Sequence, residues 1–222
     1  MDCDEIKDYI EAFKNSKSKR LDLSNKDIEQ LPVEIGNLDW IEHINLSYNY
    51  LTELPEALFE LKNLKSILLT RNQLKHLPAS ISKLTNLMTL DISNNKLTSL
   101  PEEIGELENL EILDASYNKL ESLPLELINL LSIRKLYLEE NTLHFPPQKV
   151  VKRGLYAVMH YLTHMKKKRD ATRVYLQVFN MPEESRDMFE QYLNNFNNLV
   201  SNIIKHEIHF NYSYINPEDK KD

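Results

Sequence analysis

The chain of 222 residues has a single cysteine, Cys3. One thiol excludes an internal disulfide framework and a metal cluster held by cysteines, and such scarcity is typical of proteins from reducing compartments. We therefore expect a cytoplasmic location. Cys3 also has no histidine or basic cluster near it in the sequence, so we interpret it as an ordinary reduced thiol and not as a nucleophile.

Glycine is almost as scarce, with three residues far apart in the sequence: Gly36, Gly105 and Gly154. Loops that bind phosphates need closely spaced glycines, because their backbone N–H groups must approach the phosphate. A P-loop and a dinucleotide-binding fingerprint are therefore excluded. We expect no nucleotide cofactor.

Two histidine pairs have the spacing of metal ligands on a helix or turn. They are His160 with His164, and His206 with His209. Neither pair has an obvious third ligand, so we interpret both as surface or packing histidines. No set of side chains in the sequence resembles a catalytic site, and we expect no metal and no enzymatic activity.

The sequence also lacks a run of about 18 apolar residues, which a membrane-spanning helix needs, and its first residues contain no apolar signal segment. The net charge is -7, with both signs mixed along the chain. No overall basic field is present that could hold a nucleic acid. We expect neither a membrane nor a nucleic acid as partner.

What the sequence does contain is a repeat of 23 residues. Each repeat begins with an approximate L-x-x-L-x-L-x-x-N-x-L pattern, at Ser18, Ile41, Leu64, Leu87, Leu110 and Ile133. The sixth repeat is partial. A fixed period of this kind indicates stacked units that bury a continuous core.

Within a repeat, apolar residues two apart, such as Ile44 and Leu46, predict a short strand with one face inward. The strands of successive repeats would stack in parallel. A second half-pattern, L-P-x-x-I/L-x-x-L, returns the chain in short 3₁₀ or helical pieces, because proline ends the strand and turn before it. An asparagine follows each strand, and its amide can pair with turn backbone that stacking would bury. These residues are Asn49, Asn72, Asn95, Asn118 and Asn141.

With these motifs the chain resembles the leucine-rich-repeat family, in particular the intracellular 23-residue subclass that includes Ras-suppressor-like scaffold proteins. The resemblance covers about residues 18–147 and implies an α/β solenoid with a curved parallel sheet. It implies binding of a protein partner, with a small GTPase or another signalling protein among the candidates. The family has no shared catalytic residues to carry over.

Both ends of the repeat array need a cap, since an open solenoid exposes core and an unpaired strand edge. We predict an N-terminal capping helix over residues 1–17, with an apolar face of Ile6, Tyr9, Ile10 and Phe13. The repeats span residues 18–147. A second capping helix over residues 148–170 carries Val151, Leu155, Val158, Leu162 and Met165 on one face, and ends in the basic run 166–169.

Residues 171–222 do not follow the repeat and resemble no family. Alternation at Val174, Leu176 and Val178 predicts a strand, an apolar helical face from Phe189 to Ile203 predicts a helix, and alternation from Ile208 to Tyr214 predicts a second strand. Together they indicate a small βαβ-like module, which needs further support to be stable. The solenoid, a second copy in a homodimer or another protein could each provide that support.

Candidate partner-binding residues lie between the buried positions of the strands, on the face that we call the concave face. It comprises three columns that vary between repeats, beginning at Arg20, Asp22 and Asn25 and recurring every 23 residues. Because interface energy concentrates in aromatic residues and arginine, and exposed apolar residues are informative, these columns supply our candidates. The candidates are His43, Tyr48, Leu68, Arg71, Asp91, Asp114, Tyr117 and Tyr137. A fourth column, of serine and threonine, is nearly invariant, and we interpret it as part of the repeat pattern.

The leading functional hypothesis is a scaffold or adaptor that binds a protein through the concave face. Six strands at about 4.8 Å spacing present roughly 450 Å² in projection, whereas a typical partner footprint is about 800 Å². Neighbouring loops or residues 171–222 should therefore share the contact. The alternative hypothesis makes the repeats a recognition arm for an effector or oligomerisation module at 171–222.

Overall fold

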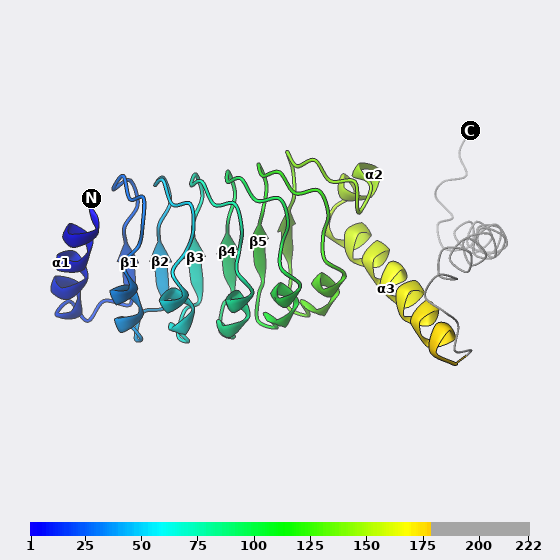
Figure 1. Cartoon of the computed structure of the whole chain (residues 1–222), viewed down its shortest axis with the longest axis horizontal. Helices are drawn as coiled ribbons and strands as arrows, with labels where there is room; N and C mark the ends of the chain where they lie inside the picture. Colours follow the sequence, from blue (N-terminus) through cyan, green and yellow to red (C-terminus); the bar gives the residue numbers. More distant parts are fainter. Residues whose placement is uncertain (179–222) are drawn as a thin grey trace, which may run out of the picture. The chain divides into compact units, whose positions relative to one another are not determined.

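The computed structural model describes the backbone of residues 1–178 and the side chains of residues 1–170. The chain divides into two compact units, Met1–Lys166 and Lys167–Asp222. The first unit contains the whole repeat array. The array lies between helix α1 (Cys3–Lys14) and the helices α2 (Gln148–Val151) and α3 (Leu155–Val178), as Figure 1 shows.

Six parallel strands form one sheet in the order of the sequence, which confirms the predicted sheet. They are β1 (Arg20–Asp22), β2 (His43–Asn45), β3 (Ser66–Leu68), β4 (Thr89–Asp91), β5 (Ile112–Asp114) and β6 (Lys135–Tyr137). Neighbouring strands are offset by one repeat, so that Ile44 pairs with Ile67 and Ile67 with Leu90. In β1 to β5 the middle residue is buried and its two neighbours face away from the core, which is the alternation expected of a strand with one inner face.

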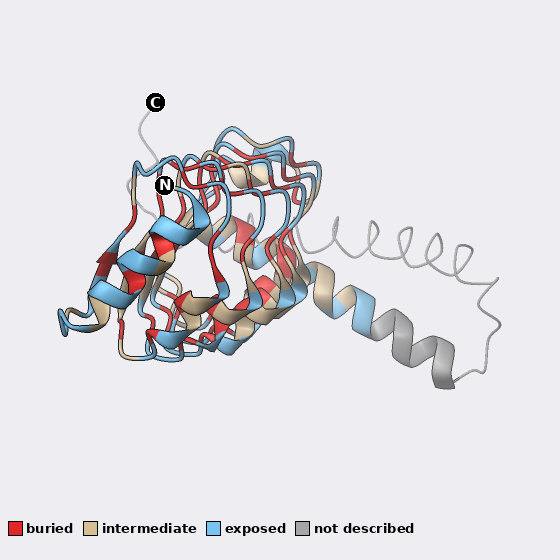
Figure 2. Cartoon of the chain, turned by 60° about the vertical axis from the view of Figure 1, so that its left-hand side comes forward, coloured by how far each residue is buried: buried red, intermediate tan, exposed pale blue. Residues whose placement is uncertain are grey.

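The second half of each repeat returns as a short 3₁₀ helix, again as predicted. These helices are η1 (Val33–Asn37), η2 (Glu56–Glu60), η3 (Ala79–Lys83), η4 (Glu102–Glu106) and η5 (Leu125–Asn129). Each begins directly after a proline in extended conformation. Burial follows the repeat pattern, with buried residues drawn in red through the interior of the repeats in Figure 2. The core is one continuous cluster, mainly of leucine and isoleucine, from Ile6 to Leu162.

The asparagine ladder has the predicted role. The side-chain oxygen of Asn72 accepts from the amide of Leu51 at 3.0 Å, and its Nδ2 donates to the carbonyl oxygens of Leu46 at 2.9 Å and Leu69 at 3.0 Å. Asn49 likewise accepts from the amides of Lys26 and Ile28. The first repeat therefore needs no asparagine of its own, because the side chain of the second repeat serves its turn.

The N-terminal cap is the helix α1. Asp2 caps it by accepting from the amides of Asp4 and Glu5, and Glu5 accepts in return from the amide of Asp2, which is a capping box. Ile6 and Ile10 are fully buried. The predicted four-residue face is only partly correct, because Tyr9 is 38% exposed and stacks on the half-buried Phe13 at 6.5 Å.

The C-terminal cap differs from the single helix that we predicted. The chain forms α2, turns at Gly154 with a φ of +84°, and then forms α3. Val158 and Leu162 are buried against the repeats, as predicted, whereas Met165 is only half-buried.

Helix α3 does not end at the basic run but continues to Val178. The predictions of a helix end at 166–169 and of a strand at 174–178 are therefore wrong. An established helix adds a further residue at little cost, whereas alternating apolar residues require a partner strand to form a sheet. The remaining elements predicted for the C-terminal module lie outside the described residues. The domain limits remain predictions.

Candidate protein-binding face

The register of the sheet places four of the candidate residues in one row. Leu68 pairs with Asp91, Asp91 with Asp114, and Asp114 with Tyr137, each on the neighbouring strand. Adjacent strands are about 4.8 Å apart, so these side chains form a contiguous strip across four of the six strands. His43 lies in the parallel column on β2, beside Arg20 and Ser66. The row has two carboxylates at its centre and an apolar or aromatic residue at each end.

Three other candidates lie just after the strands, in the tight turn. Tyr48, Arg71 and Tyr117 all have left-handed backbone conformations, with φ of 59°, 56° and 53°. Tyr48 is 51% exposed and Tyr117 is 56% exposed. The guanidinium of Arg71 lies 5.4 Å from the centre of the Tyr48 ring, a cation–π contact that joins the turns of the second and third repeats. The turn therefore presents these side chains from a fixed backbone.

The left-handed turn was not foreseen. Residues other than glycine, asparagine and aspartate rarely adopt this conformation, and tyrosine or arginine in it is strained. A signal was present in the sequence, because Asn25 and Asn94 occupy the same column and asparagine tolerates a positive φ.

Each of the two aspartates in the row uses one carboxylate oxygen in hydrogen bonds within the turn. Oδ1 of Asp91 accepts from the amide of Ser93 at 3.0 Å and from its hydroxyl at 2.6 Å. Oδ1 of Asp114 accepts in the same way from Ser116, at 3.0 Å and 2.6 Å. One oxygen of each carboxylate thus stabilises the turn, and the other is left for a partner. The same kind of bond accounts for three members of the serine and threonine column, Ser24, Ser93 and Ser116, each of which follows an aspartate two residues earlier.

The same pair of hydrogen bonds occurs in the first repeat, at Asp22. Asp22 accepts from the hydroxyl of Ser24 at 2.7 Å and from its amide at 2.9 Å. The hydroxyl bond, followed by the amide bond, lowers the pKa of Asp22 from its ordinary value. Both bonds favour the ionised form, so this turn carries a fixed negative charge at neutral pH.

A column immediately before the strands was overlooked. In it Glu42 lies between Lys19 and Lys65, bound to both ammonium groups, with a Glu42–Lys65 distance of 2.8 Å. The hydrogen bonds from Lys19 and Lys65 lower the pKa of Glu42 to about 2. Lysine, glutamate and lysine at 23-residue intervals were a visible signal for this ion ladder. In the same column Met88 is 39% exposed and presents an apolar side chain on the surface.

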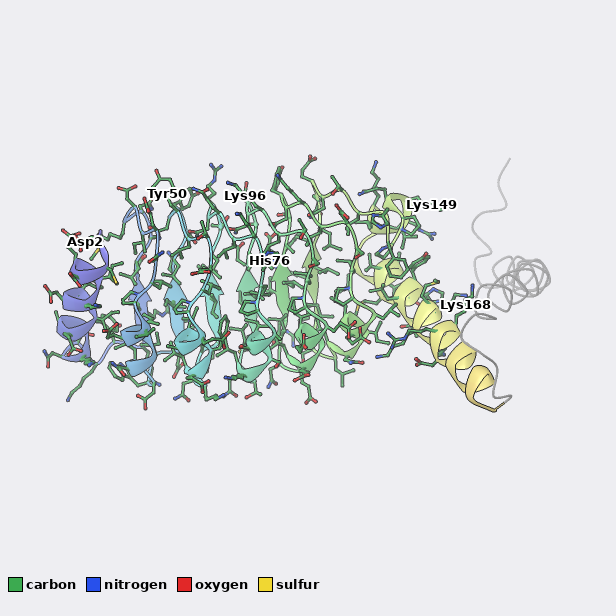
Figure 3. The ribbon with its side chains drawn as sticks, viewed as in Figure 1. Asp2, Tyr50, His76, Lys96, Lys149 and Lys168 are labelled. Atoms are coloured by element: carbon green, nitrogen blue, oxygen red, sulfur yellow. The ribbon has the colours of Figure 1, made fainter. Side chains whose placement is uncertain are left out.

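A further aromatic residue was also missed. Tyr50, two residues after Tyr48, is 50% exposed and lies with Lys96 on the loops that follow the strands (Figure 3). It borders a shallow hollow of about 360 Å³ shared with Glu29 and Gln73. The column that contains Tyr50 was not among the three varied columns from which the candidates were chosen. The aromatic surface is therefore larger than the sequence suggested.

The described residues also bear on the candidate metal ligands, the cysteine and the membrane. Within residues 1–170 no three histidine, cysteine or acidic side chains gather in a way that could hold a metal ion. Cys3 is exposed on α1. No helix among the described residues is both long and apolar enough to cross a membrane.

Comparison with known proteins identifies the class. The family model described as leucine rich repeat matches residues 16–74, 62–120 and 85–143, which together span more than half of the chain. The chain belongs to this family. Proteins with such repeats generally mediate protein–protein binding, and the matched model is that of a repeat and not of a catalytic domain. A search of curated proteins found no match.

A solved structure shares the fold of the repeat array. A leucine-rich-repeat protein of Leptospira interrogans is 32% identical with a TM-score of 0.56, over 60% of this chain and 34% of that protein. The ectodomain of an Arabidopsis thaliana receptor kinase in complex with Casparian strip integrity factor 2 is 30% identical, with a TM-score of 0.49, over 52% of this chain and 14% of its own. The plant peptide hormone receptor RGFR1 in complex with RGF2 is 36% identical, with a TM-score of 0.48, over 57% and 23%. The chain thus spans about a third or less of each of these structures.

Proposed function

We propose that the chain is a scaffold or adaptor that binds a protein partner through the concave face. The observation that carries the proposal is the contiguous row of Leu68, Asp91, Asp114 and Tyr137 on adjacent strands. Exposed tyrosines flank it in the turns. Aromatic and apolar side chains around a few fixed charges are the composition of energetic centres in protein interfaces.

The rigidity of the repeat array supports the same proposal. The candidate side chains stand on a sheet whose turns are held by asparagine and aspartate hydrogen bonds, so little entropy is lost when a partner orders them. We assign the chain to the intracellular 23-residue subclass, in the cytoplasm, with a small GTPase or another signalling protein as the class of partner. The overlooked columns of Met88 and Tyr50 enlarge the available surface toward the area that a stable complex needs.

Affinity capture tests the proposal with a variant built from residues that the repeats themselves contain. Tyr48→Asn, Arg71→Glu and Tyr137→Asn place in each column a residue that another repeat carries there, so the backbone should be retained. We call this triple substitution the concave variant. It should lose a partner that the wild-type chain captures.

A matched control changes three side chains of the returning half of the repeats. Val33→Ala, Lys83→Glu and Leu131→Ala remove two exposed apolar groups and reverse one charge, as the concave variant does for two tyrosines and one arginine. This control variant should keep the partner. Retention of every captured protein by the concave variant would overturn the proposal.

A second candidate function concerns residues 171–222, as an effector or oligomerisation module that the repeats direct. The division of the chain into units at Lys166 and Lys167 supports treating this part as separate. Deletion of residues 171–222 should then abolish oligomerisation or output while partner capture continues. Unchanged oligomerisation and output after the deletion would reject it.

A further inference from the structure

The last strand of the array, β6, has one edge with which none of the described residues pairs. In each earlier repeat two backbone amides after the strand donate to the next repeat, as Ala115 does to Tyr137 at 3.0 Å and Tyr117 does to Glu139 at 2.8 Å. The equivalent amides of the sixth repeat belong to Leu138 and Glu140. Within residues 1–178 neither has a hydrogen-bond acceptor, although Leu138 is only 4% exposed. Unpaired amides along a strand edge are a template for a further strand, so this edge is suited to pair with another strand.

The core is also uncovered at this edge. Leu136, the middle residue of β6, is half-buried, whereas the equivalent Leu113 of β5 is fully buried. The amide of Lys135 donates to Glu111 and the carbonyl of Tyr137 accepts from Ala115. Backbone groups alternate in direction along a strand, so those of Leu136 face the opposite side, where a seventh strand would lie. A seventh strand would thus gain both hydrogen bonds and apolar contact.

A cavity of about 420 Å³ lies beside this edge, between β6 and the cap formed by α2 and the first turns of α3. Its apolar lining comes from Leu136, Leu138, Val151, Leu155 and Val158. The exposed charged residues Glu139, Glu140 and Lys152 line it as well. A volume of this size is that of a small binding pocket and accommodates a few side chains of an extended peptide.

We propose that the open edge of β6 binds an extended segment of a protein partner, which adds as a seventh strand and carries a basic side chain. Its carbonyl oxygens accept from the amides of Leu138 and Glu140, and its apolar side chains enter the cavity. The basic residue faces Glu139 and Glu140, which form no ion pair with any residue that the structure describes.

The cap beside the edge favours a partner segment over a second copy of the chain. Residues of α2 and α3 lie beside the β6 edge, so two copies that paired there about a twofold axis would bring the cap of each copy against the other. A single extended segment carries no such cap. The proposal concerns a different surface from the concave row and does not rest on the proposed function.

Amide hydrogen exchange of the full chain, read residue by residue by NMR, tests whether the edge is free. The amides of Leu138 and Glu140 should exchange at least tenfold faster than those of Ala115 and Tyr117, which occupy the same positions one repeat earlier. Equal protection of the two pairs in the free chain would overturn the proposal, because the edge would then be occupied by the chain itself or by a second copy.

A positional-scanning library of blocked eight-residue peptides then serves as the probe for the partner segment. Peptides with alternating apolar residues and a lysine or arginine should bind best, and the best of them should slow exchange at Leu138 and Glu140. Absence of binding, or a best peptide without a basic residue, would contradict the proposal.

Two variants locate the binding. Glu139→Lys with Glu140→Lys should weaken the best peptide at least tenfold and remove the preference for a basic residue, whereas the control Glu53→Lys, on an exposed residue of another repeat, should leave its affinity unchanged. Val151→Trp, at a half-buried residue of the cavity, should also abolish binding by filling the space. Unchanged affinity in both edge variants would overturn the proposal.

Discussion

Replacement of Asn95 by alanine is the most informative perturbation of the solenoid. The buried side chain accepts from the amide of Leu74 at 3.0 Å and donates to the carbonyl oxygens of Leu69 at 3.0 Å and Ile92 at 3.1 Å. Asn95→Ala leaves the amide of Leu74 without its acceptor, and Leu74 is fully buried. The carbonyls of Leu69 and Ile92 keep Asn72 and Asn118 as donors. At about 1–3 kcal/mol for one stranded buried group, the free energy of unfolding should fall by about 1–3 kcal/mol. That loss is a sizeable part of the ~5–15 kcal/mol of a typical domain.

Urea denaturation of the full chain, followed by circular dichroism, measures this loss. Asn86 offers a matched control, because it is exposed and its Nδ2 donates to a single carbonyl oxygen, that of Lys62 at 2.9 Å. Asn86→Ala should cost no more than about 1 kcal/mol, the usual net value of one hydrogen bond. A loss for Asn95→Ala no larger than that of the control would refute the view that the ladder satisfies backbone groups buried by stacking.

Three further predictions concern packing and charge. Leu90→Ala, at a fully buried position of β4, should lower the free energy of unfolding by about 2–5 kcal/mol in the same assay, and a loss below about 1 kcal/mol would contradict the observed core. Gly105→Ala would place its Cβ 2.3 Å from the carbonyl oxygen of Glu126, so it should destabilise by about 1–3 kcal/mol; a neutral effect would show that η4 and η5 are less closely packed. Glu42 has a pKa lowered from 4.5 to about 2, so its stabilising contribution is present above pH 4.5 and is lost as the pH falls toward 2. By NMR titration its carboxyl should have a midpoint near 2, which should rise toward 4.5 when Lys19 and Lys65 are replaced by methionine, and an unchanged midpoint would exclude the ion ladder as the cause.

The repeat array could be predicted from the sequence because its causes are local and periodic. The apolar residues of β2 and the asparagine that follows it recur at fixed intervals, so one repeat predicts the next. The hydrogen bonds of Asn72 and its counterparts also followed from position alone, since any turn stacked on another must pair its buried amides.

Residues whose environment depends on a neighbouring repeat or cap were harder to predict. Tyr9 was assigned to the same helical face as Ile6 and Ile10, yet it is 38% exposed whereas they are fully buried. The column of Asp91 and Asp114 varies between repeats, so both were interpreted as binding residues. Each also accepts a hydrogen bond from the serine two residues later. A single sequence shows the variation of a column but not the bonds that its members form.

The C-terminal cap shows the limit of periodicity as a guide. Alternating apolar residues at 174–178 fit a strand, yet the helix that begins at Leu155 continues through them. The choice between the two depends on whether a partner strand is available, which is a matter of tertiary structure. For the same reason the open edge of β6 could be recognised only after the strands were in register.

The most direct test of the central claim is calorimetric titration of a captured partner against the wild-type chain, the concave variant and the control variant. If the concave face carries the energetic centre of the interface, the concave variant should bind at least about 30-fold more weakly, which corresponds to about 2 kcal/mol. The control variant should bind as the wild type does. Equal affinity of the concave variant and the wild-type chain, or a loss confined to the control variant, would contradict the claim.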